Sequence, residues 1–238
     1  MLTGSVLRGG RTARWAFTAR AGGASLPPYD ALNVASHVGD DPTLVRANRA
    51  ALEATLAAGP IAWSGPVHGV DVALLDAPTP LVPNVDALGT ARTRLPLATM
   101  GADCVPLLLA AGDLVIAAHV GWRGLVDGMT HTLATLLEER GIDAATALVL
   151  LGPAICGTCY GIPVERADRI AATCPGALQT AANGGPGADI RRGLAIEWEA
   201  RGATVEFHGP CTAESASHFS HRRDGITGRQ AGVIAWLD

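Results

Sequence analysis

The sequence predicts a single domain, residues 1–238, of mixed α and β structure. The chain has 238 residues, of which 48% are hydrophobic and 17% charged, so it can bury a large core without dividing into separate domains. No repeat, low-complexity tract or hydrophilic linker interrupts it. Short apolar strands and amphipathic helices follow one another in irregular order, which argues against a doubly wound sheet.

The N-terminal half is expected to consist mostly of strands. Residues 14–19 alternate as a strand does, and the Gly- and Pro-rich residues 21–28 form a turn. Asp41 suits an N-cap and Pro42 the first helical position, so a helix begins there, and we expect it to end near Ala57. Further strands are expected at residues 70–75, 95–99, 104–110 and 114–120, the last two joined by a turn at residues 111–113.

The C-terminal half mixes helices with strands. Leu125, Met129, Leu133, Leu136 and Leu137 recur at helical spacing and predict an amphipathic helix that ends near Gly141. We then expect a buried strand at residues 147–151, helices at 164–173 and 190–201, and strands at 204–207 and 233–236.

Composition excludes several classes of function. The formal net charge is −4, so the broad attraction of a basic protein to nucleic acid or to an anionic membrane is missing. All 18 basic residues are arginine, which excludes Schiff-base chemistry and the P-loop lysine. We expect neither a targeting signal nor a membrane span, and an odd count of five cysteines is typical of a reducing compartment. These features predict a cytoplasmic protein.

Residues 115–124 are the first candidate for chemistry, because an apolar strand there runs into a glycine-bracketed turn and a helix. Backbone N–H groups at such a helix start bind anions, and Arg123 would add a positive fork for phosphate or carboxylate. His119 ends the strand. The alternative is that His119 packs in the core and Arg123 lies on the surface, as isolated residues of these types usually do.

Two more residues extend this candidate site. Cys104 begins another apolar strand, and His68 stands just before a strand, next to a glycine. Together with His119 they make a three-ligand zinc site with an open fourth position, which is the pattern of catalytic zinc. The separations of 36 and 15 residues form no local clip, so only the fold can close the site, and an inert buried cysteine is the alternative. Asp103 would act as a general base, orient a ligand, or merely cap a turn.

Two other patterns leave their alternatives open. Cys156-Gly157-Thr158-Cys159 is a C-x-x-C, which fits a redox dithiol or half of a structural zinc site. No second C-x-x-C completes a zinc ribbon, so we favour an incidental pairing. The three arginines at residues 222–229 surround a turn and favour either a small anionic ligand or a salt-bridged loop.

Motifs spread over nearly the whole chain match a known family in the right order. They are residues 17–25, 32–34, 37–41, 48–49, 67–69, 102–106, 118–124, 152–155 and 219–229. With these motifs the chain resembles the family first called multicopper polyphenol oxidoreductases or laccases, and later described as zinc-dependent purine nucleoside phosphorylases. The resemblance implies an α+β fold, a single domain of mixed β-sheets flanked by helices in a layered α/β sandwich.

The resemblance also implies site residues and a cofactor. His68, Cys104 and His119 would hold the metal, with zinc expected and copper as the other candidate. Asp103 and Arg123 are the expected catalytic residues. Arg20, Asn33 and Arg49 are expected to bind substrate, the arginines by holding phosphate.

The family is similar in activity to enzymes that split adenosine, inosine, guanosine and methylthioadenosine with phosphate, and it also deaminates adenosine. Some bacterial members are instead named peptidoglycan editing factors, which makes a metal-dependent amidase acting on a mis-loaded cell-wall precursor the alternative. A copper polyphenol oxidase is less well supported, because its copper clusters need many more histidines than two. We expect a monomer that takes a purine nucleoside and phosphate, with no nucleic-acid or membrane partner.

The chain departs from the family pattern at two positions. Pro66 stands where the family usually has glutamine, and Gly161 where it has glutamate. The metal ligands are unchanged, so these departures affect the expected shape of the substrate pocket.

Overall fold

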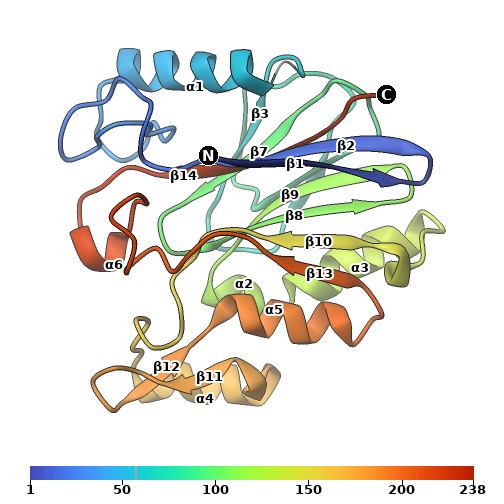
Figure 1. The fold of residues 1–238 in the computed structure, drawn as a ribbon. Helices are drawn as coiled ribbons and strands as arrows, with labels where there is room; N and C mark the ends of the chain where they lie inside the picture. The colour runs from blue at the N-terminus through green and yellow to red at the C-terminus, as the bar shows by residue number, and fades with distance from the viewer. Residues whose placement is uncertain (57) are drawn as a thin grey trace.

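In the computed structural model, which describes residues 1–56 and 58–238, two six-stranded sheets lie face to face (Figure 1). The first sheet has the order β1 (Leu2–Arg8), β2 (Arg11–Phe17), β14 (Gln230–Trp236), β7 (Leu97–Gly101), β3 (Ala62–Gly65) and β5 (Leu81–Pro83). The second has the order β13 (Thr204–Phe207), β10 (Leu148–Leu151), β8 (Val105–Ala111), β9 (Leu114–Val120), β6 (Ala87–Thr90) and β4 (Val72–Leu74). Both sheets combine parallel and antiparallel pairs.

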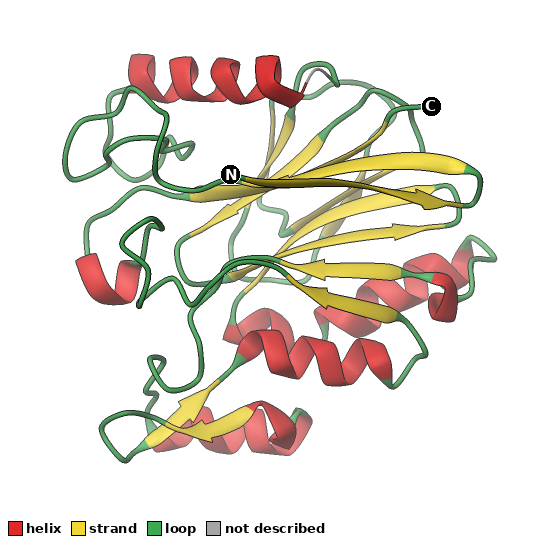
Figure 2. Cartoon of the chain, viewed as in Figure 1, coloured by secondary structure: helices red, strands yellow, loops and turns green. Residues whose placement is uncertain are grey.

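Helices cover the outer face of each sheet (Figures 1 and 2). Helix α1 (Pro42–Leu56) packs on the first sheet, and α2 (Trp122–Val126), α3 (Met129–Glu139) and α5 (Ile190–Glu199) pack on the second. Helix α4 (Val164–Thr173) lies beyond them beside the small hairpin of β11 (Leu178–Thr180) and β12 (Pro186–Ala188), and the short α6 (His221–Asp224) stands at one end. This is the mixed, layered α+β fold that the sequence predicts.

Side chains of the central strands point alternately to the two faces of the second sheet, so they contribute to two separate core clusters. Leu107 and Leu109 of β8 face the helices, whereas Leu108 faces the first sheet, and both sets are fully buried. Because both faces of the second sheet are covered, β8 and β9 read as continuous apolar runs. A third cluster, including Leu52 and Trp63, fills the space under α1.

Helix α1 matches the prediction at its start, where the Asp41 carboxylate accepts a hydrogen bond from the Thr43 N–H at 2.7 Å. The end predicted near Ala57 lies outside the described residues. The helix predicted from Leu125 to Gly141 is wrong as a single element, because Gly128 adopts a left-handed φ of 91° and divides it into α2 and α3.

Several short strands were not predicted, namely β1, β3, β5, β6, β11 and β12. The strand expected at residues 70–75 is shorter and forms only β4. These segments have three to seven residues, and β3, β5 and β6 are stabilised by pairing with strands that are not their neighbours in the sequence. Local periodicity therefore carries little signal for them.

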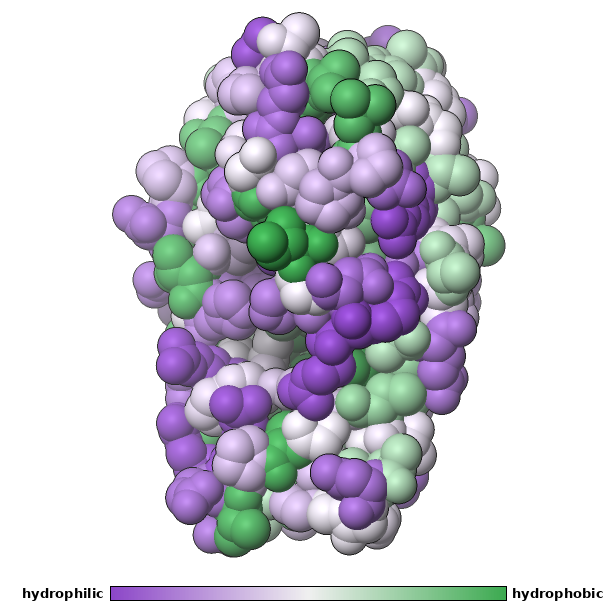
Figure 3. Space-filling view, turned by 90° about the vertical axis from the view of Figure 1, so that its left-hand side faces the viewer, coloured by the Kyte–Doolittle hydropathy of each residue, from purple (hydrophilic) through white to green (hydrophobic). Residues whose placement is uncertain are grey.

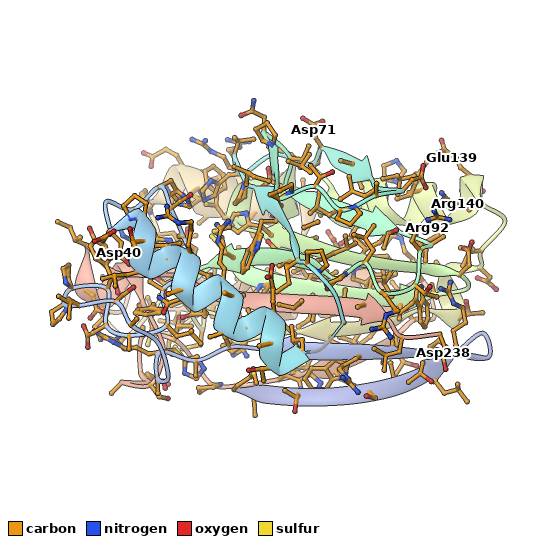
Figure 4. All side chains as sticks on the ribbon, turned by 90° about the horizontal axis from the view of Figure 1, so that it is seen from above. Asp40, Asp71, Arg92, Glu139, Arg140 and Asp238 are labelled. Atoms are coloured by element: carbon orange, nitrogen blue, oxygen red, sulfur yellow. The ribbon has the colours of Figure 1, made fainter. Side chains whose placement is uncertain are left out.

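The long loops gather at one end of the sandwich, near the start of α1. Seen from above, Asp40 lies at that end, whereas Arg92, Arg140 and Asp238 lie at the other (Figure 4). Helix α1 has 15 residues, and no helix within the described part of the chain is both long and apolar enough to cross a bilayer.

Replacing Leu108 by alanine opens a cavity between the sheets, because this side chain is fully buried there. We expect the free energy of unfolding to fall by about 2–5 kcal/mol. Leu7→Ala, at a position that is 65% exposed, should change it by less than about 0.5 kcal/mol. Denaturant unfolding of both variants measures this, and equal losses would contradict the layered core.

Candidate metal centre and pocket

A buried carboxylate, Asp86, lies directly opposite His119. Strand β6 pairs antiparallel with β9, and the pair Ala87–Ala118 places the preceding Asp86 beside His119. The Asp86 carbonyl accepts the His119 backbone N–H at 2.8 Å, and its carboxylate lies 2.9 Å from His119 Nδ1. This contact fixes the imidazole ring and leaves Nε2 as the free nitrogen.

The same carboxylate shapes the loop that carries His68. It accepts backbone N–H groups from Val67 at 3.1 Å, His68 at 3.0 Å and Gly69 at 2.7 Å. His68 has a positive φ of 64°, which is unfavourable for a non-glycine residue, and these hydrogen bonds stabilise that conformation. Asp86 is fully buried, and although burial opposes ionisation, its bonds to His119 and the loop lower its pKa. One carboxylate therefore positions two candidate ligands.

Cys104 reaches the same point through a hairpin. Strands β8 and β9 are joined by a tight turn at Gly112, and their register pairs Val105 with Val120. The residues at the open end of the hairpin, Cys104 and His119, are thus close neighbours.

His68, Cys104 and His119 come together as the sequence predicts, with one candidate ligand atom of each residue within 4.8 Å of the others. Cys104 Sγ lies 3.8 Å from His68 Nε2, and the two imidazole rings meet edge to face at 4.8 Å between centroids. Gly121 leaves room for this group, because a Cβ would lie 3.1 Å from both Cys104 Sγ and the His68 ring, a tight contact.

The electrostatics of this group favour a thiolate. Burial alone would raise the pKa of Cys104, but the charge and hydrogen bond of His119, together with His68, lower it to about 6. For His119, burial acts to lower the pKa, and the Cys104 thiolate and Asp86 raise it to about 9. An imidazole, a thiolate and a second imidazole oriented by a carboxylate form a donor set that fits Zn²⁺, so these residues are suited to hold the metal.

The group lies in the wall of a pocket of about 430 Å³, a size suited to a small organic ligand. Its apolar part includes Met100, Trp122, Ile155 and Ile190, and its polar part includes His37, Tyr160, Arg166, His221, Arg222 and Arg229. Figure 3 shows the end of the molecule that carries the loops and α6, where hydrophilic side chains surround a hollow.

Asp103 lines this pocket, but both of its carboxylate oxygens are already engaged. Oδ1 accepts the Thr212 hydroxyl at 2.6 Å, and Oδ2 accepts the Arg222 backbone N–H at 2.7 Å. The carboxylate thus holds α6 against the pocket. This geometry suits a positioning residue better than a general base.

Arg123 is exposed and lies over Trp122, 5.6 Å from the ring centroid, outside the pocket lining. Arg20 is bound to Asp30, by a 2.8 Å ion pair among other contacts, and also lies outside the lining. In the part of the chain that the structure describes, neither Arg123 nor Arg20 therefore lines the pocket. Arg123 was expected there because it follows His119, Gly121 and Trp122, which do line the pocket, whereas no other member of the Arg20 motif lines it.

Asn33 and Arg49 lie behind the pocket wall. Asn33 is fully buried and accepts the Arg229 backbone N–H at 2.9 Å, so it acts on the pocket through Arg229. Arg49 donates to the Val34 carbonyl at 2.8 Å and stacks on Trp63 at 4.4 Å. Asn33 and Arg49 therefore support the pocket wall from behind and do not line the pocket.

The arginines that do line the pocket are Arg166, Arg222 and Arg229. Arg166 donates to the Tyr160 hydroxyl at 3.2 Å and stacks on Trp122, and Arg222 donates to the Gly161 carbonyl at 2.9 Å and stacks on Tyr160. The sequence indicated the region of Arg222 and Arg229 as a patch for an anion. It gave no signal for Arg166 or Asp86, because their roles depend on strand register and helix packing.

Fold and pocket together define a layered α+β protein built around a His-Cys-His group. Residues 14–237 match the family model described as multi-copper polyphenol oxidoreductase laccase, and the chain belongs to this family.

Curated relatives support the same assignment. Purine nucleoside phosphorylase SCO2081 of Streptomyces coelicolor is 43% identical over 233 residues, covering 95% of this chain and 96% of the relative. Purine nucleoside phosphorylase PA4543 of Pseudomonas aeruginosa is 37% identical, covering 92% and 91%. The crystal structure of YlmD from Geobacillus stearothermophilus superposes with a TM-score of 0.86 at 31% identity, covering 95% of this chain and 92% of that chain. The Bacillus licheniformis hypothetical protein YfiH gives a TM-score of 0.87 at 28% identity, covering 94% and 92%.

Asp86→Asn should weaken metal binding at this site by about 10- to 100-fold, because an amide cannot accept all the hydrogen bonds that orient His68 and His119. Isothermal titration of metal-free protein with Zn²⁺ measures the change. Asp71→Asn is the matched control, because the Asp71 side chain is exposed and it is the backbone carbonyl that accepts the N–H groups of Asp86 and Ala87. Unchanged affinity in Asp86→Asn would contradict the role assigned to Asp86.

In the metal-free protein, Cys104 should react with iodoacetamide with a midpoint near pH 6, because its thiolate forms above its lowered pKa. The rate should therefore rise as the pH rises through about 6. Peptide mass spectrometry follows this cysteine separately from the other four. His119→Ala should move the midpoint upward, and zinc should protect Cys104. A midpoint at the pH of an ordinary thiol would contradict the lowered pKa of Cys104.

Proposed function

We propose that this protein is a zinc-dependent purine nucleoside phosphorylase that splits adenosine, inosine, guanosine and methylthioadenosine, and that it also deaminates adenosine. The observation that carries the proposal is the His68, Cys104 and His119 group in the wall of a pocket that also contains arginines and apolar side chains. The names of the curated relatives support the reaction class. We further propose a cytoplasmic monomer.

Phosphorolysis requires a phosphate oxygen to attack C1′ of the ribose while the bond from C1′ to the purine nitrogen breaks and its electron pair leaves with the base. Arg229 and Arg222 are the proposed phosphate-binding residues, because a guanidinium fork suits an oxyanion and both line the pocket. Asn33 and Asp103 hold the backbone N–H groups of these two arginines. Two buried or half-buried polar side chains thus preorganise the anion site.

The apolar lining suits the purine. Tyr160 and Trp122 contribute aromatic rings to the lining, and Ile155 and Met100 contribute aliphatic side chains. A zinc ion held by His68, Cys104 and His119 would supply Lewis-acid stabilisation of developing negative charge. Pro66, one of the two departures from the family pattern, lies in the lining, whereas Gly161 contributes its carbonyl to Arg222.

One observation favours a second candidate function. Cys104, His119 and Asp86 follow each other as a thiol, an imidazole and a carboxylate, which is the order of a cysteine nucleophile with its base and orienting group. Without metal, this arrangement would support amide hydrolysis of a cell-wall precursor. A copper oxidase has less support, because the two metal-capable groups among the described residues contain only two histidines, both in one group.

The test is phosphate-dependent release of base from adenosine and inosine, with metal analysis of the same samples. Arg229→Ala should raise the KM for phosphate by about 10- to 100-fold, the value of one charge-assisted hydrogen bond. Arg140→Ala, at the opposite end of the molecule, is the control of equal charge (Figure 4). His68→Ala should abolish release. Bound zinc without any phosphate-dependent turnover would contradict the phosphorylase, and a metal-free protein without such turnover would favour the cysteine-dependent amidase.

A further inference from the structure

A second group of metal-capable side chains lies outside the pocket. It consists of Cys156, Cys159, Cys211 and Glu214. Cys156 and Cys159 occupy a turn beyond β10, closed by the Cys159 N–H bonded to the Cys156 carbonyl at 3.2 Å. Cys211 and Glu214 come from the segment beyond β13, more than fifty residues later in the chain.

Strand pairing brings these two segments together. Strands β10 and β13 are parallel neighbours, so their continuations leave the sheet at the same end. Ala154 forms a further parallel bridge with Cys211, and the Thr212 N–H donates to the Ala154 carbonyl at 3.1 Å. The convergence of the cysteines is therefore built into the topology of the sheet.

The distances match a tetrahedral centre. One ligand atom from each of the four residues lies within 4.8 Å of the other three, and Cys159 Sγ is 3.4 Å from Glu214 Oε1. Zinc bound to sulfur at about 2.3 Å and oxygen at about 2.0 Å would place these two atoms about 3.5 Å apart. The Cys156 backbone N–H donates to Cys211 Sγ at 3.3 Å, which is the outer contact that stabilises a metal-bound thiolate.

We propose that Cys156, Cys159, Cys211 and Glu214 form a second, structural zinc site. Three sulfurs and one carboxylate supply a complete set of four ligands, so no position remains open for substrate. A disulfide would use only two of the three sulfurs and would leave the convergence of Cys211 and Glu214 unexplained. The prediction of an incidental C-x-x-C rested on the lack of a second such motif, and Cys211 and Glu214 complete the set without one.

The site would stabilise one wall of the pocket. Tyr160, which lines the pocket, follows Cys159 directly, and Thr212, which follows Cys211, donates to Asp103 at 2.6 Å. Arg222 bonds to the carbonyl of Gly161 in the same turn. A metal that joins the two segments thus holds Tyr160 and α6 in place relative to the first centre.

The test is the zinc content of the full-length protein, purified under reducing conditions. We expect two zinc ions per chain in the wild type and the loss of one in Cys159→Ser, with the remaining ion lost when His68→Ala is added. Cys174→Ser is the matched control and should retain both ions, because Cys174 is buried beneath α5 and belongs to neither group. A wild-type protein with one zinc that Cys159→Ser leaves in place would overturn the proposal.

A second variant remains informative if the cysteine variants fail to fold. Glu214 is exposed, so Glu214→Gln should keep the fold, and its zinc should be released to a competing chelator at about tenfold lower chelator concentration or less. Cobalt substitution gives an independent readout. Cys104→Ser should keep most of the thiolate-to-cobalt absorption, because three of the four thiolates belong to the second site. Absorption lost entirely in Cys104→Ser, or a Cys156–Cys159 disulfide that persists under reductant, would overturn the site.

Discussion

The buried carboxylate of Asp86 is the constraint on which the first centre depends. It lies just before β6, accepts three backbone N–H groups from the His68 loop and contacts the His119 ring. A buried charge is costly unless it is fully hydrogen-bonded, and here each contact also positions a candidate metal ligand. The unfavourable backbone of His68 and the orientation of His119 thus have a single physical cause.

The pocket has two sides that are built differently. One side is formed by packed strands and the other by loops. The β8–β9 hairpin supplies Cys104 and His119 from the packed centre of the second sheet. The opposite wall comes from the turn after β10 and from α6, which Asp103 and Thr212 tie together. Ligands held by packed strands, with a loop-built wall opposite, suit a site that must both hold a metal and bind a substrate.

The sequence predicted the parts of this arrangement that depend on local pattern. Two apolar runs around a turn indicated strands β8 and β9, and Cys104 and His119 were recognised as candidates because each lies at the edge of one of these strands. Asp86 was missed because its role follows from the register of β6 against β9, and β6 is too short to be recognised by periodicity. Arg123 was expected at the pocket, and the neighbouring Gly121 and Trp122 do line it, but a motif does not specify which way each side chain points. Cys211 joins Cys156 only through the parallel pairing of β10 and β13, which no local signal reveals.

The central claim is that His68, Cys104 and His119 hold zinc in the wall of an anion-binding pocket. A crystal grown with phosphate and measured at the zinc absorption edge tests it most directly. The account predicts an anomalous peak at bonding distance, about 2.0–2.3 Å, from all three side chains, with phosphate density against Arg229. Absence of a peak there, with Cys104 Sγ hydrogen-bonded to His119 instead, would contradict the account.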